Sequence, residues 1–134
     1  MDLAHAVDFV RDNHHAVLAT RAPTGLQTTP VLAGVAPDGR LVVSSRETAY
    51  KTKNLRRDPW AQLCVLPDQF FGSWVWIEGS AEVVALPEAM DLLVGYYRDI
   101  SGETDWDAYR AAMVSERRVA IMITPIAAGP NRQG

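Results

Sequence analysis

The chemistry that this sequence suggests is concentrated in one basic, hydroxyl-rich segment, residues 44–59. Both lysines of the chain, Lys51 and Lys53, lie in this segment with three of the eleven arginines, although the whole chain has a net charge of -3. The segment begins with two serines, Ser44 and Ser45. Hydroxyl and cationic side chains gathered in this way are donors suited to a phosphate or another anion. The segment is therefore the candidate anion site.

A strand followed by a short helix would position these groups. The apolar run at 41–43 leads into the serines, Thr48 is of a residue type that caps helix N-termini, and Asp58-Pro59 ends the helix. The first turn of a helix presents unpaired N–H groups and the positive end of the helix dipole, so a phosphate is expected where strand meets helix, beside Lys51. The alternative is a surface helix whose basic side chains are merely solvated, as is common for charged runs.

Short apolar runs separated by turn residues indicate a mainly β protein. Strands are expected at 16–20, 27–35, 41–45, 61–66, 73–84 and 118–125, and helices at 3–13, 87–98 and 104–113. Pro30 cannot donate to a β-ladder, so it is expected at an edge, a bulge or a ligand. Gly79, inside the long fifth run, is typical of a bulge at which a small barrel turns a corner. This order predicts a six-stranded antiparallel barrel with α insertions.

Composition narrows the class of protein further. A single domain, 1–134, is expected, with 126–134 as a loose tail, because this length suits one hydrophobic core. A mean hydropathy of -0.07, with no long apolar run, argues against a membrane span. The N-terminus does not resemble a signal peptide and the single Cys64 cannot form an internal disulfide, so a cytoplasmic protein is expected. The three histidines are not at metal-ligand spacing, so no metal is expected.

Five segments, AVLAT, QTTPV, PDGRLVVSS, KTKNLRRDPWAQL and WIEGSAEVV, resemble in this order the pyridoxamine 5'-phosphate oxidase-like split β-barrel family of flavin and deazaflavin oxidoreductases. The later segment YYRDISGETDWDAYRAAMVSERRVAIMITP is similar to the branch of that family that uses the deazaflavin coenzyme F420. The resemblance covers 10–125, and its most specific parts are KTKNLRRDP and DWDAYRAAM. It implies that the barrel is a split barrel of the FMN-binding type.

The resemblance also implies a homodimer that holds its cofactor between two barrels. The strand-to-helix segment would bind the phosphate, while the second strand and a tryptophan from either subunit would line the ring and the ribityl chain. The cofactor-binding residues implied are Thr28, Thr29, Pro30, Val31, Ser44, Ser45, Ala49, Tyr50, Lys51, Asn54, Arg57 and Trp74. The sequence departs from the family pattern at Ala49, where an arginine is frequent, and in a shorter turn before Thr28.

The activity implied is transfer of a hydride from reduced F420 to a conjugated small-molecule acceptor such as an enone, a quinone or a tetrapyrrole. Because the cofactor would carry this chemistry, no Ser/His/Asp order or nucleophilic cysteine motif is needed, and the sequence shows none. Tyr109, Met113 and Arg117 are interpreted as the wall of the acceptor pocket. Ordinary helix packing explains Tyr109 and Met113 equally well.

Three alternatives stay open. FMN is the rival cofactor, since it too carries a phosphate on a ribityl chain, whereas Lys53, Arg56 and Arg57 would suit the acidic tail of F420. A non-catalytic flavin-binding or F420-binding protein would need the same residues. A small RNA-binding barrel would use the basic helix, but acidic residues are dispersed over the rest of the chain, so no nucleic-acid partner is expected.

Overall fold

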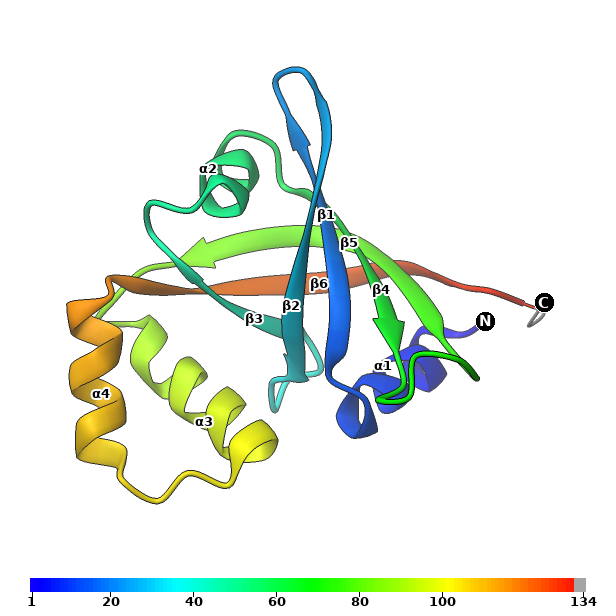
Figure 1. The fold of residues 1–134 in the computed structure, drawn as a ribbon. Coiled ribbons are helices and arrows are strands. Elements are labelled where there is room, and N and C mark those ends of the chain that lie inside the picture. Colours follow the sequence, from blue (N-terminus) through cyan, green and yellow to red (C-terminus); the bar gives the residue numbers. More distant parts are fainter. Residues whose placement is uncertain (132–134) are drawn as a thin grey trace.

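Six antiparallel strands form a closed barrel in the computed structural model, which describes residues 1–131 (Figure 1). The strands are β1 (His15–Ala22), β2 (Gly25–Val35), β3 (Leu41–Arg46), β4 (Trp60–Leu66), β5 (Val75–Val84) and β6 (Arg118–Gly129). Their order around the barrel is β1-β2-β3-β6-β5-β4. The predicted fold class, a mainly β six-stranded antiparallel barrel with α insertions, is therefore confirmed.

Alternating side chains fill the interior of the barrel. Leu18, Val43, Leu63, Ile77 and Ile121, each from a different strand, are at most 1% exposed and belong to one core cluster. Because successive residues of a strand point to opposite faces, their neighbours form the outer face of the barrel. The pairing of β5 with β6 shifts register at Gly79, which confirms the bulge expected there.

The β-ladder between β2 and β3 covers only part of the two strands. The first strand pairs with β2 along its whole length, but β3 pairs with β2 only through Ala33–Val35 and Leu41–Val43. The first part of β2 therefore has no β3 neighbour, and the β1–β2 hairpin projects from the barrel at the top of Figure 1. Pro30 lies in this stretch, which pairs with β1 but not with β3, in agreement with the edge position expected for it.

Two of the four helices found within residues 1–131 contribute side chains to the barrel core. The helix α1 (Leu3–Asp12) buries Ala6 and Val10, and its N-terminus is capped by Asp2, whose carboxylate accepts from His5 N at 2.7 Å. The helix α2 (Tyr50–Arg57) buries Leu55 in the same cluster. The two helices lie at opposite ends of the barrel in the view of Figure 1.

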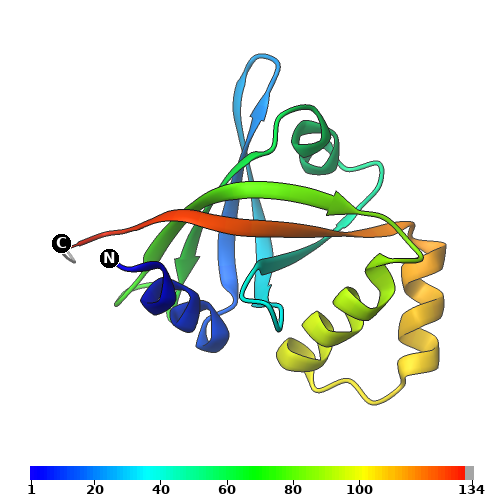
Figure 2. The same ribbon diagram turned by 180° about the vertical axis from the view of Figure 1, so that it is seen from behind.

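The other two helices cover the outer face of β3 and β6. The helices α3 (Ala89–Ser101) and α4 (Trp106–Ser115) form a pair on the side of the barrel away from α1, as Figure 2 shows. Leu93 and Met113 of this pair share a second core cluster with Val42 of β3 and Met122 of β6. Within residues 1–131, no helix combines the length and the apolar character that crossing a bilayer requires.

Three local predictions are wrong. The N-cap of α2 is Ala49, not Thr48, and no side chain caps it. The N-cap of α4 is Asp105, whose carboxylate accepts from Ala108 N, so Thr104 does not begin the helix.

The loose tail predicted from 126 is wrong over 126–129, because β6 continues to Gly129 and pairs with β5. Gly129 allows this pairing, since a Cβ there would lie 2.4 Å from Trp76 Nε1. Residues 132–134 of that predicted tail lie outside the described part of the chain.

Candidate cofactor and anion site

Three cations, two from the segment 44–59 and one from the start of β6, gather at one end of β3. Arg46 ends β3 and is paired in register with Arg118, the first residue of β6. Lys51 lies in the first turn of α2 and is half-buried. Burial lowers the pKa of Lys51, and the charges of Arg118 and Arg46 lower it further. We call Arg46, Lys51 and Arg118 the cationic cluster.

One carboxylate, Glu116, faces the cationic cluster. Its Oε1 accepts from Arg118 Nη2 at 2.8 Å, from Arg118 Nε at 3.0 Å and from Arg46 Nη2 at 3.3 Å. Hydrogen bonds from Arg118 and then from Arg46 lower the pKa of Glu116. In the described part of the chain no carboxylate forms an ion pair with Lys51, so the cluster has more positive than negative charge. A half-buried surplus of positive charge is the electrostatic requirement for an anion site.

Buried hydrogen bonds fix α2 against the barrel. The hydroxyl of Ser45 lies 2.7 Å from the hydroxyl of Thr52, which itself donates to the carbonyl of Arg46 at 2.6 Å. Asn54 Nδ2 donates to Gln27 Oε1 at 2.7 Å and to Thr20 Oγ1 at 3.1 Å. The side chains of Ser45 and Asn54, both predicted to bind the cofactor, thus anchor the helix that carries Lys51.

The remaining predicted residues of this segment lie nearer the surface. Ser44 and Ala49 are half-buried, and the side chain of Tyr50 is 72% exposed. Arg57 donates to the carbonyl of Arg21 at 2.7 Å and to Asn54 Oδ1 at 3.2 Å, so it already has protein partners. Of these residues, Ser44 is the one that lines a cavity with Arg118.

The four predicted residues of β2 point alternately to two faces. Thr29 is paired with Leu18 and Val31 with Ala16, both of which are buried inside the barrel. The side chains of Thr28 and Pro30 therefore point to the outer face, as does Leu32. A ligand on the outer face can meet the side chains of Thr28 and Pro30, but it can reach Thr29 and Val31 only through the backbone.

A cavity of about 520 Å³ lies between α3, α4 and the outer face of the barrel, within the usual size range of small-molecule sites. We call it the tyrosine pocket. Its lining consists of Leu32, Ser44, Tyr96, Tyr97, Glu103, Ala108, Tyr109, Ala112, Met113, Glu116 and Arg118. The pocket brings together Ser44 with Tyr109 and Met113, which were predicted from distant segments, and joins them to the cationic cluster through Arg118.

Stacked aromatic rings form one wall of the tyrosine pocket. The rings of Tyr97 and Tyr109 lie 4.6 Å apart at an angle of 10°, and Trp106 meets Tyr109 edge-on at 5.6 Å. The Tyr109 hydroxyl donates to the carbonyl of Leu93 at 3.0 Å, and that of Tyr96 donates to the carbonyl of Leu32 at 2.9 Å. Burial raises the pKa of Tyr109 to about 12. Tyr109 is thus a fixed, neutral part of the wall.

Two more of the predicted residues, Arg117 and Trp74, also lie outside the tyrosine pocket. Arg117 is exposed, with a left-handed φ of 53°, and its carbonyl accepts from Glu47 N at 2.9 Å. Trp74 precedes β5 and lines a separate cavity of about 320 Å³ with Cys64, Phe70 and Phe71. Within one protomer, the structure does not bring Trp74 to the residues around Lys51.

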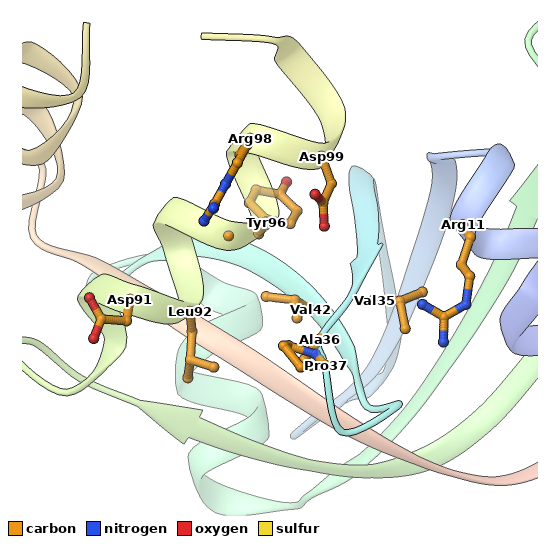
Figure 3. Close-up of a pocket in the computed structure, with 11 residues that line it drawn as sticks. Arg11, Val35, Ala36, Pro37, Val42, Asp91, Leu92, Tyr96, Arg98 and Asp99 are labelled. Carbon is orange, nitrogen blue, oxygen red and sulfur yellow. The ribbon is translucent and has the colours of Figure 1, made fainter. Parts of the chain in front are cut away.

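A third cavity, of about 440 Å³, lies between α3 and the turn that joins β2 to β3 (Figure 3). Arg11, Asp91, Arg98 and Asp99 line it with apolar residues, and none of the predicted site residues does. Tyr96 lines both this cavity and the tyrosine pocket. Among residues 1–131, no three His, Cys, Asp or Glu side chains come together in a way that could hold a metal ion.

Sequence reasoning missed Arg118, Glu116, Tyr96 and Tyr97. The adjacent basic residues at the start of the last strand were a possible signal, but only the register of β6 against β3 shows that Arg118 lies beside Arg46. Tyr96 was hidden because helical periodicity in α3 identifies a buried stripe without showing which of its members border a cavity.

The profile of the pyridoxamine 5'-phosphate oxidase family matches residues 3–129. The conserved hypothetical protein Rv2991 of Mycobacterium tuberculosis is similar in structure, with a TM-score of 0.77 and 28% identity over 96% of this chain and 82% of that one.

Two more distant structures share the fold. An F420 reductase aligns with a TM-score of 0.71 and 19% identity, over 91% of this chain and 94% of its own. A FAD-binding protein of Mesorhizobium loti aligns with a TM-score of 0.67 and 17% identity, over 96% and 92% of the two chains.

Proposed function

The chain belongs to the pyridoxamine 5'-phosphate oxidase family, and from this premise we propose that it is an oxidoreductase with a flavin-type cofactor, coenzyme F420 in the first place. The reaction proposed is reduction of a conjugated small molecule, such as an enone, a quinone or a tetrapyrrole. One observation carries the proposal: a cationic cluster with surplus charge borders an aromatic pocket. In a flavin-type cofactor, the phosphate of the ribityl chain would suit the cationic cluster and the flat ring system would suit the aromatic pocket.

The residues present fit such a cofactor. Arg46, Lys51 and Arg118 would hold its phosphate, because their positive charge exceeds that of Glu116 and Lys51 has no carboxylate partner among the described residues. Ser44 is half-buried and lines the same pocket as Arg118, so its hydroxyl would add a neutral donor. The apolar wall of the tyrosine pocket would receive a flat ring, either of the cofactor or of the acceptor.

When bound, the reduced cofactor supplies a hydride for the acceptor. The chain's own residues would bind and orient the two molecules and exclude water from them. The stacked rings of Tyr97 and Tyr109 present a rigid apolar surface, which suits this positioning role. The hydroxyls of Tyr96 and Tyr109 are both engaged with backbone carbonyls, so neither is assigned as a proton donor.

The choice of F420 over FMN depends on charge beyond the phosphate site. Lys53 is exposed and lies over the Tyr50 ring at 5.8 Å, so it remains available to an acidic tail. Arg56 is less available, because it forms an ion pair with Glu47 at 2.8 Å. A similar fold in an F420 reductase and in a FAD-binding protein supports a flavin-type ligand in general. FMN is therefore kept as the alternative cofactor.

We also propose that the protein is a homodimer with the cofactor between two barrels. The outer face of the barrel carries half-buried apolar side chains on neighbouring strands, including Val17, Leu66 and Trp76. The loop before β5 adds Phe70 and Phe71, of which Phe71 is 79% exposed. An apolar face of this kind is typical of a protein interface. In such a dimer the partner's copy of the loop could bring its tryptophan to the ring.

A non-catalytic flavin-binding or F420-binding protein is the second candidate, because the tyrosine pocket shows no group assigned to proton transfer. To separate the candidates, the purified protein is examined for a visible spectrum and titrated with F420 and with FMN in parallel. Tighter binding of F420, with acceptor-dependent oxidation of the reduced cofactor, is the expected result. Retention of FMN would replace the first choice by the alternative. Binding without turnover would indicate the non-catalytic protein, and no binding of either would overturn the proposal.

A further inference from the structure

Glu116 faces the cationic cluster at the point where a ligand's anionic group would bind. Its Oε1 accepts three hydrogen bonds, two from Arg118 and one from Arg46, at 2.8 to 3.3 Å. An anion that binds to these two guanidinium groups must therefore compete with a carboxylate that belongs to the protein itself. Such a carboxylate also reduces the repulsion among Arg46, Lys51 and Arg118 when no ligand is bound.

The backbone holds Glu116 in this position. Glu116 is the C-cap of α4, and its N–H donates to the carbonyl of Ala112 at 2.8 Å. The next residue, Arg117, has a φ of 53°, a left-handed conformation that is uncommon for a non-glycine residue. The carbonyl of Arg117 accepts from Glu47 N, which ties the turn to the segment between β3 and α2. The turn thus places the carboxylate of Glu116 and the guanidinium of Arg118 side by side.

We propose that Glu116 is an internal counter-ion that competes with the bound anion and thereby sets the anion affinity of the site. It is a specificity-determining residue that reduces the affinity for every anion at the cationic cluster, and more strongly for those of higher charge. The inference rests on the proposed function only in taking the cofactor's phosphate as the natural anion. Competition at Arg46 and Arg118 follows from the hydrogen bonds alone.

The test is Glu116→Gln, which keeps the size of the side chain and removes its charge. Inorganic phosphate at pH 8 and acetate serve as probes, and binding is measured by calorimetry. Because repulsion from a fixed charge scales with the charge of the anion, we expect phosphate to bind about tenfold tighter and acetate about threefold tighter than to the wild type. Unchanged or weaker phosphate binding would overturn the proposal, since Glu116 would then merely position the two arginines.

Two control variants test whether the effect on phosphate binding comes from the charge of Glu116. Glu103→Gln lies on the rim of the same pocket, but Glu103 Oε1 accepts from the backbone N–H groups of Thr104 and Asp105, so phosphate affinity is expected to stay at the wild-type value. Glu116→Asp keeps the charge and is expected to leave phosphate binding within about twofold of the wild type. Tenfold tighter binding in either control would contradict the proposal.

Glu116→Gln could also lose its fold, because the positive charges of the cluster would then repel each other without a counter-ion. The proposal requires that phosphate restore the folded circular dichroism spectrum of such a variant, since the anion takes the place of the carboxylate. Absence of rescue would overturn it.

The same samples are titrated with F420 and FMN. If the phosphate effect is found but neither cofactor binds, the proposed function fails and this inference stands. If a cofactor binds but the variant leaves phosphate affinity unchanged, only this inference fails.

Discussion

The hydroxyl of Ser45, near the end of β3, lies 2.7 Å from the hydroxyl of Thr52 on α2. Thr52 donates its own proton to the carbonyl of Arg46, so Ser45 is the donor of the bond between the two hydroxyls. Both side chains are fully buried. The contact fixes the first turn of α2, with Lys51, beside the end of β3, and so links the stability of the barrel to the geometry of the cationic cluster.

Replacement of Ser45 by alanine is therefore expected to act on stability. Ser45→Ala removes one buried hydrogen bond and should lower the free energy of unfolding by about 1 kcal/mol, measured by urea denaturation. Ser44→Ala is the matched control, because Ser44 is half-buried and lines the tyrosine pocket. It should leave stability within about 0.5 kcal/mol of the wild type and weaken cofactor binding instead. The reverse pattern would mean that the roles of the two serines are exchanged.

The ammonium group of Lys51 is expected to strengthen cofactor binding. Lys51→Met keeps the half-buried aliphatic stem and removes the ammonium group, which should weaken cofactor binding by about 1 to 3 kcal/mol, the range of one charge-assisted contact. Lys53→Met, two residues along the same helix, removes an exposed ammonium group and should leave the affinity for the phosphate group unchanged. Fluorescence titration of both variants with FMN, which carries the phosphate but no acidic tail, measures the difference. Equal affinities of the two variants would refute the assignment of Lys51.

The barrel and the location of the cationic segment could be predicted because they depend on local signals. Apolar runs, turn residues and the concentration of Lys51 and Lys53 in one segment are all visible in the sequence. The residue that completes the cluster, Arg118, could not be predicted, because its proximity to Arg46 depends on the register between β3 and β6. Register is a property of the folded sheet, and a shift of one residue would turn Arg118 to the opposite face.

Side-chain roles were less predictable than positions. Ser44 and Ser45 are adjacent in the sequence, yet one lines a pocket and the other is buried under α2, because successive residues of a strand face opposite sides. Thr48 was expected to cap α2 on residue type alone, but the helix starts one residue later than such a cap requires. Tertiary contacts, here the anchoring bond of Thr52, outweigh the local preference for a cap.

Tyr109 should make the stability of the protein fall at alkaline pH. Its pKa is raised by burial to about 12, whereas the ordinary value is 10, so the folded state keeps its proton when the unfolded state loses it. The stabilisation is fully present below pH 10 and is lost as pH rises toward 12. In Tyr109→Phe, urea denaturation between pH 9 and 11 should show a shallower decline than in the wild type.

At neutral pH the same variant loses the hydrogen bond to the carbonyl of Leu93, which should cost about 1 kcal/mol. Tyr50→Phe is the control at neutral pH, because the side chain of Tyr50 is 72% exposed, and its stability should match that of the wild type. If Tyr109→Phe declined with pH as steeply as the wild type, the burial of this hydroxyl could not be the cause of the alkaline loss.

Gly79 and Gly95 offer a last test, since an added methyl group should have opposite effects at the two positions. A Cβ on Gly79 would lie 2.4 Å from the carbonyl oxygen of Thr124 and 2.7 Å from Ile123 Cγ2, so Gly79→Ala must displace backbone at the bulge. We expect a loss of about 3 kcal/mol in the free energy of unfolding.

Gly95 lies inside α3, where a Cβ would meet only Arg98 Nη2, at 3.9 Å. Gly95→Ala should therefore gain about 0.5 to 1 kcal/mol, because alanine favours the helix. Urea denaturation of both variants measures these changes, and a destabilised Gly95→Ala would show that α3 needs a bare backbone there.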